Sequence, residues 1–408
     1  MNCRFCHTPL TQEFIDLAGA PPSNSFLTRE QLDEPEVYYP LKLFVCPECF
    51  LVQIDEYKKS GDIFNRGYVY YSSFSRTWLE HARAYVELAA NRLGLTRDSL
   101  VVEIASNDGY LLQYVRERGI PCLGIEPSGN TARVARERGI ESIEDFFGAR
   151  LARSLAAEGR RADLILGNNV LAHVPDINDF VSGLPLLLKE RGTVTLEFPH
   201  LLRLVAENQF DTIYHEHFSY LSLTTVQRVL AAHGLTVFDV QELPTHGGSL
   251  RVWACHAAEE DRPVSGAVAE LLARERAAGM CGLDYYRGFQ ERADRIRADL
   301  LAFLVEQKRA GRLVLGYGAA AKGNTLLNYC GARRDLLPMV ADASPHKQGL
   351  FLPGSHIPVV TPDELLAARP DVVLILPWNI KDEIMAQLAP IRSWGGRFAT
   401  AIPELSTF

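Results

Sequence analysis

The sequence predicts an α/β protein built on parallel sheets. Short apolar strands alternate with helical patterns between residues 101 and 260, and a second series of the same kind begins at residue 313. Such alternation is typical of doubly wound, Rossmann-like domains. A segment with two Cys-x-x-Cys pairs lies ahead of both series. We therefore expect a small cysteine-bearing module at 1–66, a central domain at 67–260 and a second α/β domain at 261–408.

Length and composition limit the class of protein. At 408 residues, with 47% apolar and 23% charged side chains, the chain is long enough for several globular cores. The net charge of −8 argues against a broad nucleic-acid-binding surface. No apolar run is long enough to span a bilayer, and the N-terminus lacks the pattern of a signal peptide. We expect a cytoplasmic protein without a nucleic-acid or membrane partner, and we predict no particular oligomeric state.

Four of the eight cysteines form two pairs, Cys3 with Cys6 and Cys46 with Cys49. This spacing is typical of zinc, since four thiolates close a tetrahedral shell and leave no open position for catalysis. We therefore predict a structural zinc ion. Alternating apolar residues predict a strand over 39–45 that enters the second pair. Unpaired buried cysteines or a nucleic-acid-binding zinc module are alternatives, but basic residues are not concentrated in this segment.

Aromatic and hydroxyl side chains crowd the segment 67–75, just before a predicted helix at 78–95. Side chains of this kind can line a polar pocket. A linker strand whose tyrosines pack on the core would give the same pattern. The pocket candidates are Tyr68, Tyr70, Ser72 and Ser73.

The central domain is organised around the stretch 101–112. An apolar strand at 101–104 breaks into small and polar residues at 105–109, and helical spacing follows. In doubly wound folds the ligand lies beyond the carboxyl end of such a strand, although a βα turn without a ligand is the alternative. The next strand, 122–125, ends in Glu126, and an acidic residue there can bind both ribose hydroxyls. The cofactor candidates in these two turns are Glu103, Ala105, Asn107, Asp108, Gly109, Glu126 and Pro127.

Further strands and helices continue the doubly wound pattern. Three more cofactor candidates, Asp145, Asn168 and Asn169, follow strand ends, and His173 lies just beyond the last of them. A lone histidine in that place can also be a surface or capping residue. The remaining elements predicted are helices at 131–138, 147–155, 177–189 and 224–232, and strands at 140–143, 163–166, 193–200, 237–240 and 250–254.

Four proton-handling side chains follow one another at 214–217, in the order Tyr214, His215, Glu216 and His217. On an extended segment the two histidines share one side and the other two side chains the opposite side. The spacing is not that of a zinc metalloprotease, and a metal site would lack further ligands nearby. We favour general acid–base chemistry, because histidine titrates near neutral pH and a neighbouring carboxylate can tune it. A hydrogen-bonded structural turn is the alternative.

The last third of the chain contains a second strand–turn–helix pattern. The strand at 313–315 leads into Gly-x-Gly-x-x-Ala at 316–321, and Lys322 stands at the start of the next helix, where it can meet a phosphate. A packing turn with a solvated lysine is one alternative. A nicotinamide-dependent reductase that uses this loop and Asp342 is another, but it leaves 214–217 unexplained. The other elements predicted here are a helical segment at 266–310 and strands at 339–342, 372–376 and 398–399.

Taken in order, these motifs resemble the S-adenosylmethionine-dependent sugar C-methyltransferases that act on nucleotide-linked keto-deoxysugars. The likeness covers nearly the full chain. Ala105 is a departure, because relatives often have glycine there. A non-catalytic zinc-ribbon regulatory protein is disfavoured by the acidic charge. The matching segments are the two cysteine pairs, 68–73, 103–109, 168–173, 214–217, 246–249 and 318–324.

The resemblance implies a zinc-binding module, a central class I methyltransferase domain and a C-terminal α/β domain that binds the nucleotide sugar. It also implies S-adenosylmethionine-dependent methylation at sugar carbon 3, beside a carbon-4 ketone, on a thymidine-diphosphate carrier in deoxysugar and antibiotic biosynthesis. A ketone makes the neighbouring C–H acidic and lets the charge rest on an enolate oxygen.

The same resemblance assigns roles to residues. His217 is expected to be the base, oriented by Glu216. The residues expected to position the sugar or stabilise the enolate are Tyr214, Tyr68, Tyr70 and His173. The residues expected to bind other parts of the substrate are Ser72, Ser73, Phe198, His200, His246, Lys322, Asn324 and Lys347.

Overall fold

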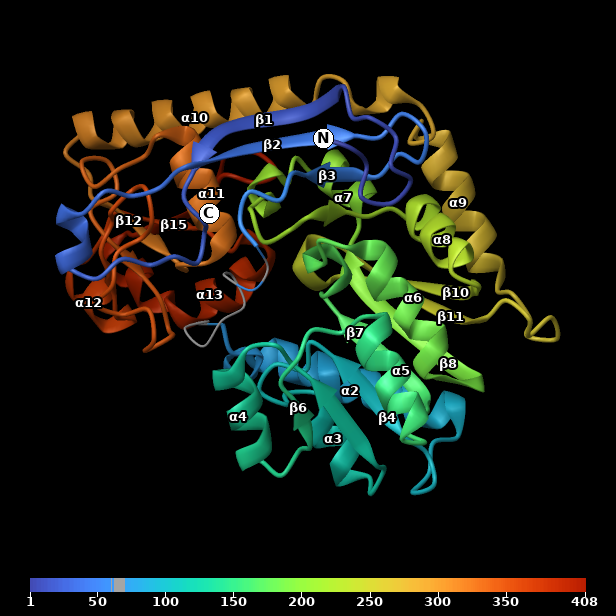
Figure 1. The fold of residues 1–408 in the computed structure, drawn as a ribbon. Helices are drawn as coiled ribbons and strands as arrows, with labels where there is room; N and C mark the ends of the chain where they lie inside the picture. The colour runs from blue at the N-terminus through green and yellow to red at the C-terminus, as the bar shows by residue number, and fades with distance from the viewer. Residues whose placement is uncertain (60, 62–69) are drawn as a thin grey trace.

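The computed structural model describes residues 1–59, 61 and 70–408, and it contains three sheets (Figure 1). One is four-stranded, in the order β1-β2-β3-β9. The second is seven-stranded, in the order β10-β11-β8-β7-β4-β5-β6. The third is six-stranded, in the order β14-β13-β12-β15-β16-β17. The α/β class predicted from the sequence is confirmed. Tyr68, a predicted pocket residue, lies outside the described residues.

The four-stranded sheet joins the cysteine-bearing module to the central domain. Three of its strands are N-terminal: β1 (Gln12–Ala20), β2 (Tyr39–Val45) and β3 (Val52–Ile54). The fourth, β9 (Ser219–Tyr220), follows the Tyr-His-Glu-His segment and pairs antiparallel with β3. The strand predicted at 39–45 is confirmed. The pairing holds the end of that segment against the N-terminal module.

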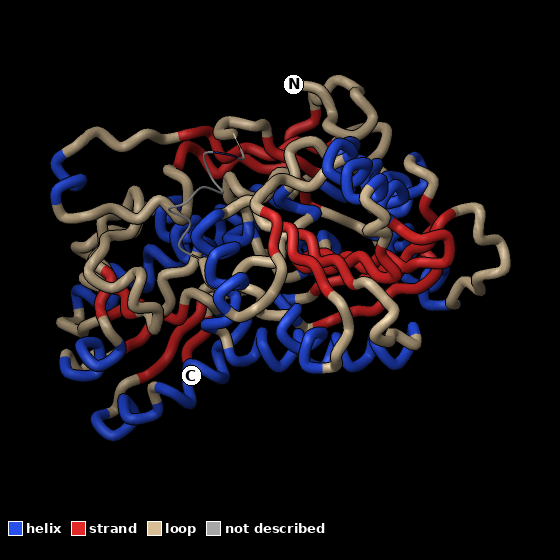
Figure 2. Tube along the Cα trace, turned by 60° about the horizontal axis from the view of Figure 1, so that its bottom comes forward, coloured by secondary structure: helices blue, strands red, loops and turns tan. Residues whose placement is uncertain are grey.

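The seven-stranded sheet is parallel at its centre and antiparallel at one edge. Figure 2 shows its strands gathered between helices. All its parallel strands end at the same edge, where a ligand site is expected. The strands are β4 (Val101–Ile104), β5 (Cys122–Ile125), β6 (Ser142–Ile143), β7 (Ala162–Asn168), β8 (Leu188–Pro199), β10 (Leu235–Leu243) and β11 (Ser249–His256). The helices are α2 (Arg76–Leu93), α3 (Leu112–Glu117), α4 (Gly129–Glu137), α5 (Ala149–Ala157), α6 (Ile177–Leu187), α7 (Leu201–Ala206) and α8 (Leu223–Ala232).

The six-stranded sheet belongs to the C-terminal unit. Its strands are β12 (Val314–Tyr317), β13 (Val340–Ala341), β14 (Val359–Val360), β15 (Val372–Ile375), β16 (Arg397–Thr400) and β17 (Ser406–Thr407). Helices α11 (Ala321–Cys330), α12 (Pro362–Ala367) and α13 (Lys381–Gln387) accompany it. All but the last pair of strands are parallel, as the second strand–turn–helix pattern predicts.

The helical segment predicted at 266–310 consists of two helices. α9 (Gly266–Ala277) and α10 (Phe289–Arg309) are separated by a turn in which Gly279 and Gly288 have positive φ angles of 93° and 77°. Glycine adopts this conformation without steric strain, so the helix ends there and the chain changes direction. Figure 1 shows α10 lying along β1 and β2 while α9 descends towards β10.

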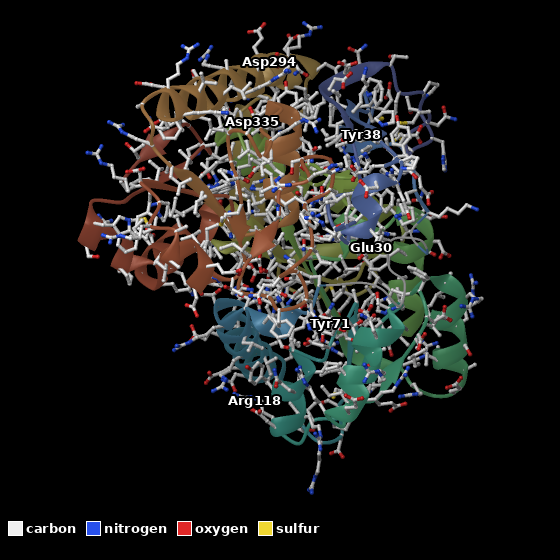
Figure 3. The ribbon with its side chains drawn as sticks, turned by 90° about the vertical axis from the view of Figure 1, so that its left-hand side faces the viewer. Glu30, Tyr38, Tyr71, Arg118, Asp294 and Asp335 are labelled. Atoms are coloured by element: carbon white, nitrogen blue, oxygen red, sulfur yellow. The ribbon has the colours of Figure 1, made fainter. Side chains whose placement is uncertain are left out.

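The N-terminal sheet shares its core with the C-terminal unit. Phe14 of β1 stacks on Phe289 of α10, with ring centroids 4.9 Å apart. Tyr38 donates a hydrogen bond to the carbonyl of Gly354 at 3.4 Å. At the junction with the central domain lies Tyr71, which is labelled in Figure 3. Its ring stacks on that of His346, with centroids 5.3 Å apart. Within the described residues, no helix combines the length and apolar character that a bilayer crossing requires.

Candidate active site

A cavity of about 260 Å³ lies at the carboxyl ends of β4, β5 and β7. This is the edge where a doubly wound sheet binds its ligand. Apolar side chains, among them Ile104, Phe147 and Phe180, form part of its wall. The predicted site residues that line it are Tyr70, Ser72, Ala105, Asn107, Glu126, Pro127, Asp145, Asn168, Asn169, His173 and His246.

The turn after β4 is held by the acidic residue at the end of β5. Ala105 and Asn107 have positive φ angles of 57° and 50°, a conformation that glycine adopts more easily. The Glu126 carboxylate accepts hydrogen bonds from the backbone N–H of Asn107 at 2.9 Å and of Ser128 at 2.8 Å. Burial raises the pKa of Glu126 above its usual range. Glu126 therefore fixes the turn and also presents a carboxyl group to the cavity.

Asn107 brings the aromatic segment to the cavity. Its Oδ1 accepts a hydrogen bond from the backbone N–H of Ser72 at 2.9 Å, and its Nδ2 donates to the carbonyl of Tyr70 at 3.2 Å. The two residues line the cavity as a result. Asn107 was expected to contact the cofactor, and the structure gives its side chain this positioning role.

Several polar side chains at the strand ends have buried atoms without a hydrogen-bonding partner among the described residues. Apart from the neighbouring Tyr110 hydroxyl, Glu103 and Asn168 find no partner for their buried side-chain polar atoms within the described chain. The Asn169 Oδ1 is likewise buried and unpaired. Buried polar groups are normally hydrogen-bonded, so this arrangement fits a polar ligand. Glu103 does not itself line the cavity, and burial raises its pKa well above the usual range.

Three predicted site residues support the cavity from outside. Asp108 accepts a hydrogen bond from the Ser73 hydroxyl and lies 3.4 Å from the Arg138 guanidinium. Gly109 has a φ of 78°, and a Cβ there would lie 2.4 Å from the Ile140 Cδ1. None of the three lines the cavity. The turn needs them for its own packing and charge balance.

His217 is a buried, neutral imidazole. Its Nδ1 lies 3.0 Å from the Thr212 carbonyl, which can only accept, so Nδ1 carries the proton. The Nε2 is buried, and among the described residues it has no hydrogen-bonding partner. Burial, with the neighbouring His173, holds the pKa of His217 well below its usual range. An unprotonated ring nitrogen is therefore available to take a proton.

Three aromatic rings pack around this imidazole, and His173 and Tyr214 are nearer to it than Tyr220. The ring centroid of His173 lies 4.6 Å from that of His217, and the Tyr214 ring lies 4.0 Å away. The Nδ1 of His173 donates to the Glu216 carbonyl at 2.8 Å, and burial lowers the pKa of His173 to about 4. Since His173 also lines the cavity, it lies between the cavity and His217.

Glu216 has a different partner from the one expected. It was expected to orient His217, but its Oε2 accepts a hydrogen bond from the Asn24 side chain at 2.7 Å. The Thr212 carbonyl orients His217 instead. Neighbouring side chains of this segment point in different directions, which separates the two groups. Burial raises the pKa of Glu216 to about 7.

His246 is a second neutral histidine at the cavity. It has a φ of 54°, and its ring lies 5.0 Å from that of Trp78. Its Nε2 is buried and has no partner in the described part of the chain. Burial lowers its pKa to about 4. The preceding Thr245 donates to Glu197 at 3.0 Å, which anchors this loop to β8.

The C-terminal unit contributes a cation to the same region. Lys322 donates to the Asn379 side chain at 2.7 Å and lies 4.7 Å from the centroid of the Trp378 ring. Trp378 in turn donates to Asp211 at 2.8 Å. Burial lowers the pKa of Lys322, and its charge helps to lower the pKa of His217. Sequence analysis assigned no role to Asp211 or Trp378, and only the fold brings these distant residues together.

The Gly-x-Gly-x-x-Ala loop is closed by side chains of its own unit. Asp342 accepts a hydrogen bond from the backbone N–H of Ala319 at 2.7 Å. Lys347 donates to the Ala319 carbonyl at 2.8 Å. A Cβ at Gly318 would lie 2.3 Å from Pro377, so this glycine serves close packing. These contacts hold the loop closed within the C-terminal unit.

Three further predicted substrate residues have structural contacts. Asn324 donates to the Ser23 carbonyl at 2.6 Å and so joins α11 to the N-terminal segment. Phe198 is fully buried in the core of the central domain. The Nε2 of His200 lies 2.7 Å from Glu275, and both side chains are buried. The structure does not bring Phe198 or His200 to the cavity.

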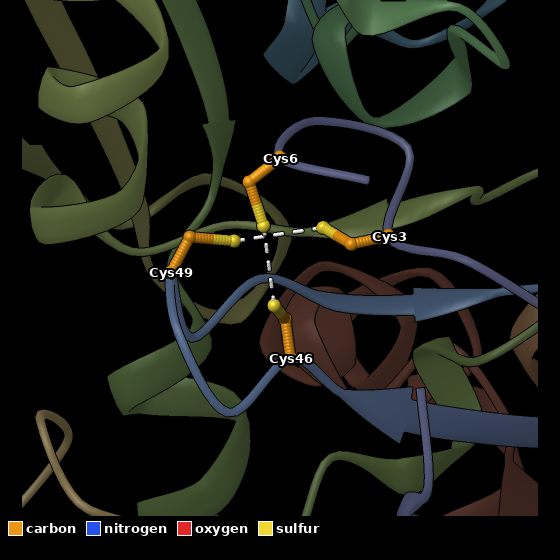
Figure 4. Close-up of side chains that lie close together, drawn as sticks. All are labelled: Cys3, Cys6, Cys46 and Cys49. Atoms are coloured by element: carbon orange, nitrogen blue, oxygen red, sulfur yellow. Dashed lines mark hydrogen bonds between the residues drawn. The ribbon is translucent and has the colours of Figure 1, made fainter. Parts of the chain in front are cut away.

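The four cysteines of the N-terminal module converge on one point (Figure 4). Their Sγ atoms all lie within 4.8 Å of one another, with Cys3 and Cys49 at 3.5 Å and Cys6 and Cys46 at 3.4 Å. Tetrahedral zinc with four thiolates requires sulfur–sulfur distances of about 3.8 Å. The four thiolates therefore form a site for a zinc ion, with no position left open for substrate.

The buried histidines of the site should make the free energy of unfolding depend on pH. The contribution of His246 can be isolated by substitution. In the unfolded chain it titrates at about 6.5, whereas the folded pKa is about 4. The unfolded state therefore binds an extra proton below pH of about 6.5, and the contribution of His246 to stability falls as the pH drops towards about 4. Relative to a His246→Gln variant, the native chain should lose about 3 kcal/mol of unfolding free energy over this range.

Urea unfolding of both chains at several pH values measures this difference. Glu216 and Asp211, whose pKa values burial raises to about 7 and about 6, act in the opposite sense and cancel in the comparison. A difference between the two chains that stays constant with pH would contradict the prediction.

Family models match three consecutive parts of the chain. Residues 3–64 match a zinc binding domain, residues 78–240 a methyltransferase domain, and residues 244–403 a C-methyltransferase C-terminal domain.

Individual methyltransferases are also similar to the chain in sequence. The chain is 37% identical over 403 residues to C-methyltransferase NovU of Streptomyces niveus, which covers 99% of this chain and 96% of that protein. It is 22% identical over 183 residues to the ubiquinone biosynthesis O-methyltransferase of Bartonella quintana, covering 40% of this chain and 72% of that protein. Among solved structures, the magnesium protoporphyrin IX methyltransferase of Synechocystis aligns with a TM-score of 0.33 and 16% identity, over 44% of this chain and 78% of that one. So distant a likeness carries no argument.

Proposed function

The chain belongs to the C-methyltransferase family, and from this premise we propose that it methylates carbon 3 of a nucleotide-linked 4-keto-deoxysugar. The methyl group would come from S-adenosylmethionine, and the carrier would be thymidine diphosphate. The observation that carries the proposal is the neutral His217, whose Nε2 is free to accept a proton. Transfer to carbon needs a base, because carbon becomes a nucleophile only after losing a proton.

The cofactor would occupy the cavity at the ends of β4, β5 and β7. Glu126 would bind the ribose hydroxyls, and the unpaired amides of Asn168 and Asn169 would bind polar groups of the cofactor. The apolar wall, which includes Phe147 and Phe180, would enclose its adenine. S-Adenosylmethionine supplies an electrophilic methyl group when bound there.

His217 would remove the proton at sugar carbon 3. The Thr212 carbonyl keeps the proton of the free imidazole on Nδ1 and leaves the Nε2 lone pair unprotonated, so Nε2 would be the atom that accepts the substrate proton. The electron pair of the broken C–H bond moves into the enolate of the carbon-4 ketone. The new carbon–methyl bond would then use the same electron pair and regenerate the ketone, while the methyl–sulfur bond breaks and its electron pair stays on sulfur, which leaves as neutral S-adenosylhomocysteine. The proton on His217 leaves to solvent after release of the product.

The enolate oxygen needs hydrogen-bond donors or positive charge near it. Tyr214 and Tyr70 lie beside the base or line the adjacent cavity, and their hydroxyl groups would serve this purpose. Neutral His173, whose one ring proton goes to the Glu216 carbonyl, would instead position the sugar. Lys322 adds a buried positive charge from the C-terminal unit. We propose that Lys322 also faces the diphosphate, since the phosphates lie a few bonds from the reacting carbon.

Mass spectrometry of nucleotide keto-sugars tests the proposal. After incubation with S-adenosylmethionine, a panel that includes thymidine-diphosphate-4-keto-6-deoxyglucose should yield a product in which one methyl replaces one hydrogen. In deuterated water without the cofactor, the hydrogen at carbon 3 should exchange with solvent. Oxidation of NADPH by the same sugars, with no methylated product, would instead support a reductase.

A further inference from the structure

Arg4 is a charged residue inside the zinc-binding module, between two of the cysteines. Its Nε is enclosed, and burial lowers the pKa of its guanidinium to about 10. No carboxylate of the described residues lies within 4.0 Å of it, so the charge has no direct ion-pair partner there. Glu56, Cys3, Asp55 and Asp176 favour the charge from longer range, so they oppose part of the desolvation, and the direct partners of the guanidinium are neutral groups.

The guanidinium contacts three separate segments. One terminal nitrogen donates to the Pro175 carbonyl at 2.6 Å, and the other donates to the Ile54 carbonyl at 2.5 Å. The guanidinium carbon lies 5.3 Å from the centroid of the Phe218 ring. Hydrogen bonds from a charged donor are stronger than those between neutral groups, so these contacts fix the three segments firmly.

Each of these segments leads to the site. Pro175 lines the cofactor cavity. Phe218 directly follows His217, and its carbonyl accepts a hydrogen bond from the backbone N–H of Ile54 at 3.2 Å. Ile54 ends β3, the strand that pairs with β9. A single side chain therefore touches the cavity wall and the neighbour of the base.

The backbone around Arg4 is anchored as well. Its N–H donates to the Gln53 Oε1 at 2.8 Å, and the Gln53 Nε2 donates to the Cys3 sulfur at 3.2 Å. From the other side, Asn178 of α6 donates to the Arg4 carbonyl at 3.2 Å. The guanidinium therefore extends from a fixed point beside the thiolates.

We infer that Arg4 is a positioning residue through which the zinc-binding module sets the relative placement of the cofactor cavity and the base. The inference rests on the proposed function, because it assigns Arg4 to the geometry of methyl transfer. Small displacements between a base, a substrate and a cofactor reduce rates strongly, and about 1 Å can reduce a rate about a hundredfold.

The test compares Arg4→Gln, Arg4→Lys and the control Arg228→Gln in the full-length, zinc-loaded protein. Arg228 makes contacts of the same kind at the second cysteine pair, since it donates to the Glu48 carbonyl at 3.0 Å and lies 5.7 Å from the Phe50 ring. It is exposed on α8 and touches neither the cavity nor the base. The readouts are bound zinc, affinity for S-adenosylhomocysteine, and deuterium exchange and methylation of thymidine-diphosphate-4-keto-6-deoxyglucose.

We expect Arg4→Gln to retain its zinc, to bind S-adenosylhomocysteine several times more weakly, and to lose about tenfold or more in exchange rate and kcat, with a smaller change in KM for the sugar. Arg4→Lys keeps the charge and one carbonyl contact, so it should recover part of the rate. Arg228→Gln should match the native protein.

Several outcomes would overturn the inference: native affinity and rate in Arg4→Gln, loss of zinc in proportion to loss of rate, or an equal loss in Arg228→Gln. If Arg4→Gln does not fold, a fully native Arg4→Lys overturns it. If the native chain neither exchanges nor methylates the sugar, the proposed function fails, and the S-adenosylhomocysteine affinities of the same variants still decide the role of Arg4.

Discussion

Replacing His217 with asparagine should abolish both deuterium exchange at sugar carbon 3 and methyl transfer, while S-adenosylhomocysteine binds as before. Asparagine can still donate to the Thr212 carbonyl, which holds the native ring at 3.0 Å, but it has no basic lone pair. Loss of a general base reduces rates by a factor of about a hundred to about ten thousand. Single-turnover exchange and methylation, followed by mass spectrometry, measure both steps.

His215→Gln is the matched control for this prediction. His215 lies two residues away and its Nε2 donates to the Pro40 carbonyl at 3.2 Å, a contact that a glutamine amide, which reaches as far as Nε2, can replace. It should therefore retain most of the native rate. Equal losses in the two variants would mean that disturbance of the segment, rather than loss of a base, explains the effect. An active His217→Asn variant would remove the basis of the proposed mechanism.

Replacing Cys49 with serine should cause a large loss of folding stability, because the chain should no longer bind zinc. Structural zinc in small modules contributes on the order of 10 kcal/mol to folding, and Cys49 is one of four thiolates within 4.8 Å of one another. The variant should lose bound zinc, and its unfolding temperature should fall by about 10 °C or more. Because β1 and β2 also pack on α10, the loss should spread to the C-terminal unit. Elemental analysis and calorimetry of the purified chain measure the two effects.

Cys281→Ser provides the control, since Cys281 is exposed and lies outside the four-cysteine cluster. It should keep native zinc content and native melting behaviour. A Cys49→Ser chain with full zinc content would show that the other three thiolates and a water ligand suffice, contrary to the prediction.

Local patterns in the sequence predict the strands and the main turns well. The alternation at 39–45 and the apolar runs ending before Ala105 and Glu126 correspond to β2, β4 and β5. These elements are predictable because each depends on side chains a few positions apart. The break between α9 and α10 was missed because isolated glycines interrupt an otherwise helical pattern, and only their positive φ angles end the helix.

Contacts between distant segments could not be read from local patterns. The partner of Glu216 is Asn24, and the partner of His200 is Glu275. The four cysteines were the exception, because metal coordination requires a recognisable spacing. Arg4 lies beside them and shows no such pattern, since its partners are backbone carbonyls that every residue carries.

The sharing of one core by β1, β2 and α10 has a consequence for synthesis on the ribosome. Phe14 leaves the exit tunnel long before Phe289, against which it stacks. Until that helix has been translated, the apolar face of the first two strands has no permanent cover. The nascent chain therefore exposes apolar surface through most of its elongation. We expect it to depend on chaperones until the final third of the chain has emerged.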